Sequence, residues 1–150
     1  MRKIIYTRPD GGVSIVCPVI NTHPQPEDIT EAEERAWDRL PANAINPRWI
    51  DATEILADRY FRDAWEDNGD IKVNMPKARE LHKERLRALR APKLTALDVE
   101  YQKADERGDS VAKAAIAAQK QVLRDVTADP RIGAAMTPEE LKAVMPDILF

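Results

Sequence analysis

The stretch MPKARELHKERLRALRAPKLTALDVEYQKADERGDSVAKAAIAAQKQVLRD, residues 75–125, decides the fold of this chain. It contains a single glycine and is dominated by Ala, Leu, Lys, Arg and Glu, residues that favour helix. This composition predicts a helix from Met75 to about Arg90. Pro92 lacks a backbone N–H and its ring clashes with a preceding carbonyl, so we expect a kink or break near residues 88–92 before the helix resumes.

A second helix follows after a very short connection. Gly108 is suited to end the first helix and Asp109 to cap the next, which we expect to run through Leu123. Two helices joined by two or three residues most often fold back on each other as an antiparallel hairpin. On the second helix, the predicted seam consists of four apolar residues at spacings of four, three and four: Val111, Ala115, Ala118 and Val122.

The N-terminal region predicts β-structure instead. The runs Lys3–Thr7 and Val13–Cys17 are rich in β-branched residues and flank a Pro-Asp-Gly-Gly turn, which is typical of a β-hairpin. Prolines then favour a loop over residues 18–28. A short helix should follow, with Thr30 as its N-cap and its end near Leu40.

Residues 41–73 give weaker signals. Residues 48–51 match a short strand, and residues 52–59 match a helical turn. A second hairpin is predicted with Phe61–Trp65 and Ile71–Val73 as its arms, because an Asn-Gly pair lies between them.

The fold class that follows is α+β. Residues 1–73 would form a small mixed α/β region with two hairpins, and residues 74–150 a helical hairpin with a short terminal helix. That last helix is expected from Pro138 to about Val144, because Thr137 precedes a proline and two glutamates in the pattern of a capping box.

Composition limits the classes of function. The 150 residues carry a net charge of −3, and no run approaches the roughly 18 apolar residues that a membrane span requires. The first residues lack the apolar segment of a secretory signal and the chain has one cysteine, so we expect an intracellular protein without disulfides. Glycine-rich phosphate-binding motifs are absent, and two histidines with one cysteine do not make the usual structural zinc site. The sequence therefore predicts no catalytic residues, no cofactor and no metal.

Two features are candidates for binding another molecule. Four basic residues at spacings of four, four and three form one stripe on the first long helix: Arg79, Lys83, Arg87 and Arg90. Such a stripe can be a solvated face, can meet an acidic protein, or can follow nucleic-acid phosphates, and nucleic acid is the least expected because the chain is acidic. Trp65, next to the second predicted turn, is either a core anchor or a hot spot of a protein interface.

Four segments carry a family resemblance: FRDAWEDNGDIKVNMPKAREL from residue 61, RALRAPKLTALDVEY from 87, IAAQKQVLRDVTADPRI from 116 and TPEELKAVMP from 137. Together they resemble the phage tail assembly chaperone family, small proteins of tailed phages and prophages. The resemblance implies a non-enzymatic role in building the tail, with a tail or tail-fibre protein as partner and the host cytoplasm as the place of action. A permanent component of the virion tail tip or fibre is the alternative, and a nucleic-acid-binding regulator is a second one. A homo-oligomer is compatible with each of these roles.

Overall fold

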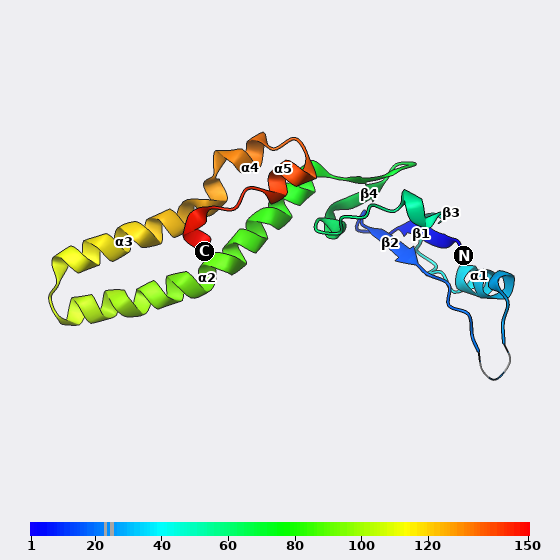
Figure 1. Cartoon of the computed structure of the whole chain (residues 1–150), viewed down its shortest axis with the longest axis horizontal. Coiled ribbons are helices and arrows are strands. Elements are labelled where there is room, and N and C mark those ends of the chain that lie inside the picture. Colours follow the sequence, from blue (N-terminus) through cyan, green and yellow to red (C-terminus); the bar gives the residue numbers. More distant parts are fainter. Residues whose placement is uncertain (23, 25) are drawn as a thin grey trace. The chain divides into compact units, whose positions relative to one another are not determined.

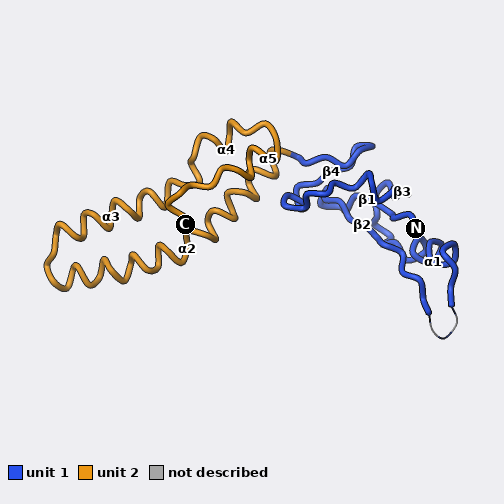
Figure 2. The backbone as a smooth tube through the Cα atoms, in the orientation of Figure 1, with its two compact units in different colours: residues 1–74 blue, residues 75–150 orange. Residues whose placement is uncertain are grey.

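A computed structural model describes residues 1–150 except residues 23 and 25, which lie inside the loop predicted over 18–28. The chain is α+β and divides into two compact units, Met1–Asn74 and Met75–Phe150 (Figure 2). The division falls one residue beyond the predicted boundary. Unit 1 contains the strands, and unit 2 is helical (Figure 1).

The larger sheet of unit 1 has three antiparallel strands in the order β2-β1-β3, formed by Val13–Val16, Lys3–Thr7 and Ile45–Ile50. The predicted first hairpin is confirmed, and its turn contains Gly11 at a φ of 80°, a conformation that suits glycine. Strand β3 starts earlier than the predicted 48–51. It tolerates Pro47 because it is an edge strand, where a missing N–H costs little.

Helix α1 spans Ile29–Asp38 and begins two residues before the expected position. Its N-cap is Asp28, not Thr30. The Asp28 carboxylate accepts from the backbone N–H of Glu31 at 2.8 Å, and the Glu31 carboxylate accepts from the backbone N–H of Asp28 at 3.0 Å. Asp28 and Glu31 therefore form a capping box, and the prediction of Thr30 as the N-cap is wrong.

The second hairpin is present, but its first arm was misplaced. Strand β4 is Trp65–Asp67 and pairs with β5, Ile71–Val73, while the residues just before β4 form a 3₁₀ turn over Arg62–Ala64. A second 3₁₀ turn covers Ala52–Glu54, within the predicted helical turn. The core of unit 1 joins both sheets through five buried side chains: Ile5, Val13, Ile50, Trp65 and Ile71.

Helix α2 of unit 2 runs without interruption over Met75–Glu106, so of the two expectations at Pro92 the break is wrong. A kink is consistent with the bend that α2 shows near its middle (Figure 1). The reason lies in tertiary contacts on both sides of the proline. Before it, Arg90 donates to the backbone of Leu123, and after it, Asp98 pairs with Lys120. Both partners belong to α3, so α3 contacts α2 on either side of the proline and these contacts offset its unfavourable effect on the helix.

Helix α3 spans Ser110–Asp125 and forms the predicted antiparallel hairpin with α2 (Figure 1). Asp109 caps it as expected, because its carboxylate accepts from the N–H of Ala112. The predicted seam is wrong, however. Its four members, Val111, Ala115, Ala118 and Val122, are all exposed, and the residues turned toward α2 include Ala112, Ile116 and Leu123.

Short elements complete unit 2: a 3₁₀ turn Val126–Ala128, α4 Pro130–Ala134, α5 Pro138–Lys142 and a 3₁₀ turn Asp147–Leu149. The capping box at Thr137 is confirmed, although α5 ends before the expected Val144. These elements cover the first half of α2, where His82 is fully buried and its Nε2 donates to the carbonyl of Val144 at 2.8 Å.

Candidate functional site

The two ends of the basic stripe are occupied with internal contacts. Arg79 donates to the backbone carbonyl of Ala135 at 2.8 Å. Arg90 donates to the carbonyls of Leu123, at 3.3 Å, and Arg124, at 2.5 Å, in the last turn of α3. Both side chains therefore link the C-terminal part of unit 2 to α2 through hydrogen bonds within the chain, which the spacing of the stripe did not indicate.

The two central members of the stripe pair with glutamates one turn earlier on the same helix. Lys83 donates to Glu80 at 2.8 Å, and Arg87 donates to Glu84 at 2.5 Å. The ammonium of Lys83 lowers the pKa of Glu80 from its usual value by this hydrogen bond. Two charges of the stripe are thus paired with carboxylates and the other two side chains are engaged with backbone carbonyls, which weakens the interpretation of the stripe as a track for phosphates.

Trp65 lies in the core of unit 1 and is 1% exposed. Of the two interpretations open from the sequence, the structure supports the core anchor. Trp65 belongs to one core cluster with Ile5 and Ile71, which the local strand pattern did not indicate.

An apolar groove of about 480 Å³ lies on unit 2 and was not predicted. Its walls come from α2, α3 and the last 3₁₀ turn. The apolar lining consists of Ala96, Leu97, Leu123 and Ile148, and the polar lining of Lys93 and Gln119. The feature brings residues together from three distant parts of the sequence, so no local pattern could have revealed it.

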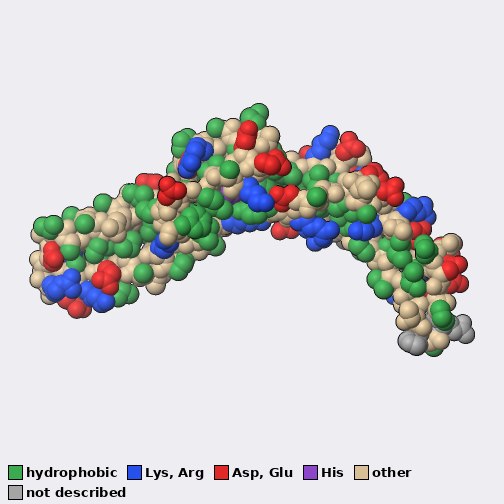
Figure 3. Space-filling model, viewed as in Figure 1, with side chains coloured by type: hydrophobic (Ala, Val, Ile, Leu, Met, Phe, Trp, Pro, Cys, Tyr) green, Lys and Arg blue, Asp and Glu red, His purple; other side chains and the backbone are tan. Residues whose placement is uncertain are grey.

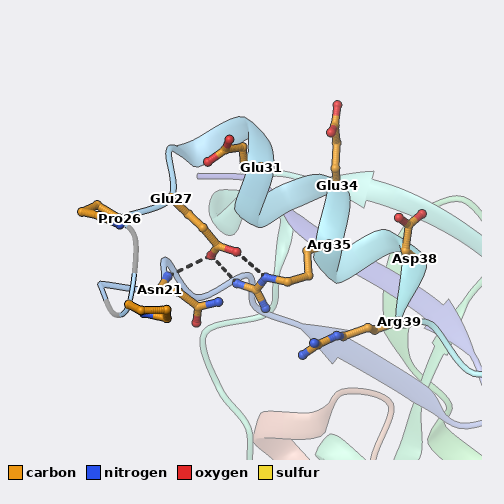
Figure 4. Close-up of a pocket in the computed structure, with 9 residues that line it drawn as sticks. Asn21, Pro26, Glu27, Glu31, Glu34, Arg35, Asp38 and Arg39 are labelled. Atoms are coloured by element: carbon orange, nitrogen blue, oxygen red, sulfur yellow. Dashed lines mark hydrogen bonds and ion pairs between the residues drawn. The ribbon is translucent and has the colours of Figure 1, made fainter.

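Unit 1 has an open, strongly charged cleft between α1 and the preceding loop (Figure 4). At its centre, Arg35 donates to both carboxylate oxygens of Glu27, at 2.8 and 2.7 Å, and to the carbonyl of Val19 at 2.6 Å. The Arg35 guanidinium, helped by the backbone N–H of Asn21, lowers the pKa of Glu27 to about 2. Because these groups satisfy each other, we interpret the cleft as a fastening of the loop to the helix.

A smaller cleft on the same unit contains a stack of aromatic rings. Trp37 and Trp49 stack with ring centroids 5.3 Å apart, and the Arg2 guanidinium lies 4.5 Å from the Trp49 centroid. Arg2 also donates to Glu33 at 2.6 Å, which lowers the pKa of that buried carboxyl. This set of contacts fastens α1 to the edge of the sheet.

The side of α3 turned away from α2 is an exposed apolar helix face. Figure 3 shows hydrophobic side chains along the α3 edge of the hairpin. Val111 is 80% exposed and Val122 is 52% exposed. The sequence identified these residues correctly as a stripe but assigned them to the wrong side.

Within the described residues, no group of three or more His, Cys, Asp or Glu side chains is arranged to hold a metal ion. No helix of the described part combines the length and apolar character needed to cross a bilayer. The chain matches no protein-family model, no curated protein and no solved structure.

Proposed function

We propose that this protein is a non-enzymatic bacteriophage tail assembly protein that acts as a chaperone for a tail or tail-fibre component. Two lines of evidence support the proposal. The first is the resemblance of four segments between residues 61 and 146 to the phage tail assembly chaperone family. The second, which carries the mechanism, is the open apolar groove on unit 2.

The groove suits a polypeptide segment better than a small polar metabolite. Its walls are aliphatic, through Leu97, Leu123 and Ile148, and they desolvate an apolar side chain that enters between them. Lys93 supplies one positive charge to the lining. The client segment that fits this chemistry is an amphipathic one with an apolar anchor and a nearby carboxylate.

The chaperone role requires that the client be released, and the modest size of the groove is consistent with release. A groove formed by six residues contacts far less area than the roughly 800 Å² per partner of a stable interface. The protein would hold the client while it is unassembled in the host cytoplasm and yield it to the growing tail.

A co-purification experiment tests this function. The full chain is expressed with each tail and tail-fibre protein of the phage that encodes it, and capture is compared for the unmodified chain, Ala96→Arg and Ala91→Arg. Ala96 lines the groove and is exposed, so arginine there obstructs the groove without opening a core cavity. Ala91 is exposed on the same helix and does not line the groove, which makes it the matched control.

Capture of one tail protein by the unmodified chain and by Ala91→Arg, but not by Ala96→Arg, supports the proposal. Capture of none of them contradicts it. The composition of purified particles then distinguishes two forms of the role. Absence from mature particles supports a chaperone, whereas stoichiometric presence makes the protein a permanent tail component and overturns the transient mechanism.

A further inference from the structure

The outer face of α3 has a composition that is unusual for an exposed helix. We define this face by the residues on the side opposite α2: Val111, Ala114, Ala115, Ala118, Gln121, Val122 and Asp125. All seven are exposed. Over the first 14 residues of the helix, the face carries no charge, since Asp125 at its C-terminal end is its only ionisable member.

The lysines of α3 are held on the other side. Lys113 pairs with Asp105 and Lys120 pairs with Asp98, both on α2. Each ammonium also lies over the ring of Tyr101, at 5.4 and 5.3 Å from its centroid. Lys113 and Lys120 are the only charged residues of α3 between Ser110 and Leu123. Because both are held against α2, the outer face is left without charge over this span.

We propose that the outer face of α3 binds the same face of a second copy of this chain, with the two helices antiparallel. The spacing of Val111, Ala115, Ala118 and Val122 is the four-three-four alternation of a coiled-coil seam. In an antiparallel pair centred between residues 116 and 117, Val111 lies opposite the second copy's Val122. The same register places Ala115 opposite the second copy's Ala118. The seam is thus complementary to itself.

Charge favours the antiparallel arrangement over the parallel one. Asp125 is the last residue of the outer face, and the register places it opposite the second copy's Gly108, next to Arg107 and the N-terminus of α3. A helix N-terminus carries partial positive charge, so both features attract the carboxylate. A parallel pair would instead place the two Asp125 carboxylates side by side.

The size of the residues also fits a second helix. Alanine at the two central positions lets helix axes approach to about 8 Å, the lower end of the usual range. One 16-residue helix offers less contact area than the roughly 800 Å² per partner of a standard interface, so we expect association in the micromolar range. The inference does not rest on the proposed function, because none of the seven residues lines the apolar groove.

Sedimentation equilibrium of the full chain tests the interface. We expect a reversible monomer–dimer equilibrium, and we expect Ala118→Glu to weaken it at least tenfold, since it introduces a buried charge into each half of the seam. Ala117→Glu is the matched control, because Ala117 is exposed on the same helix but outside the outer face. A chain that remains monomeric up to about 500 µM, or equal weakening by the two variants, would overturn the proposal.

Disulfide cross-linking tests the register and does not depend on introducing a charge. In a Cys17→Ser background, Val111→Cys and Val122→Cys chains are oxidised separately and as a mixture. The antiparallel register places the two types of cysteine opposite each other, so the mixture should form a covalent dimer much faster than either chain alone. Faster cross-linking of Val111→Cys with itself would indicate a parallel pair and refute the register.

Discussion

The basic stripe of α2 offers the sharpest test of the structure, because its four members should respond differently to the same substitution. Replacing Arg79 or Arg90 by methionine removes a guanidinium that donates to backbone carbonyls of the C-terminal part of unit 2. Replacing Lys83 or Arg87 by methionine removes only a partner of a glutamate on the same helix. Methionine preserves most of the aliphatic stem, so packing changes little.

The magnitude follows from the contacts that are lost. A hydrogen bond from a charged donor contributes about 1.5–3 kcal/mol to the free energy of unfolding. Arg90 also compensates the negative end of the α3 dipole, which contributes about 0.3–1 kcal/mol more. At a urea dependence of roughly 1–3 kcal/mol per molar, Arg79→Met and Arg90→Met should each lower the unfolding midpoint by about 1 M. Lys83→Met and Arg87→Met should leave it unchanged within error, since exposed pairs contribute little.

The assay is urea unfolding of the full chain, monitored by circular dichroism at 222 nm, where the long helices of unit 2 dominate. The protein contains an internal control. All three tryptophans lie in unit 1, so tryptophan fluorescence should report the same transition in all four variants. Equal destabilisation by all four substitutions, or none by Arg79→Met and Arg90→Met, would refute the division of the stripe into structural and solvated members.

Three further predictions concern single side chains. Trp65→Ala should destabilise unit 1 by about 3–5 kcal/mol, and the unfolding midpoint reported by fluorescence of the remaining tryptophans should fall. A change below about 1 kcal/mol would contradict the place of Trp65 in the core. Pro92→Ala should raise the free energy of unfolding measured at 222 nm by about 1–3 kcal/mol, because α2 is continuous there and alanine supplies the missing N–H. Destabilisation would contradict this reasoning. The pKa of Glu27 is held near 2 in the folded chain, against 4.5 ordinarily, so its pairing with Arg35 stabilises unit 1 above about pH 4.5 and this contribution is lost between pH 4.5 and 2. The Glu27→Gln chain should therefore be less stable than the unmodified chain at pH 7, and its stability should fall less on acidification. Identical pH profiles of the two chains would contradict the assignment.

Local signals in the sequence predicted much of the fold. The first hairpin, the helix cap at Asp109 and the capping box at Thr137 depend on residues within a few positions of one another, and all three are confirmed. The continuity of α2 through Pro92 depends on α3, which begins 18 residues later. Propensity alone favours a break there, and only contacts distant in the sequence outweigh it.

The candidate binding residues were less predictable, for a related reason. The stripe from Arg79 to Arg90 is present on one side of α2 as its spacing predicted. Its spacing does not tell whether a cation faces solvent or the carbonyl of another element. The carbonyl partners belong to residues 123, 124 and 135, which are joined to α2 only by the folding of the hairpin. The apolar groove was not predicted for the same reason, because its lining residues come together only when the hairpin folds.

The choice between the two sides of α3 illustrates how competing patterns are resolved. Val111, Ala115, Ala118 and Val122 would have formed a regular seam, yet the helix turns Ile116 and Leu123 toward α2 instead. Ile and Leu have larger apolar surfaces than Ala and Val, and burial stabilises at about 25 cal/mol per Å².

Electrostatics select the same side. Rotating α3 to bury the valines would carry Lys113 and Lys120 away from Asp105 and Asp98 and from the ring of Tyr101 between them. Burial and ion pairing therefore act together to fix one rotation of the helix. The consequence is that the regular valine–alanine seam is left on the surface, available to a second helix of the same kind.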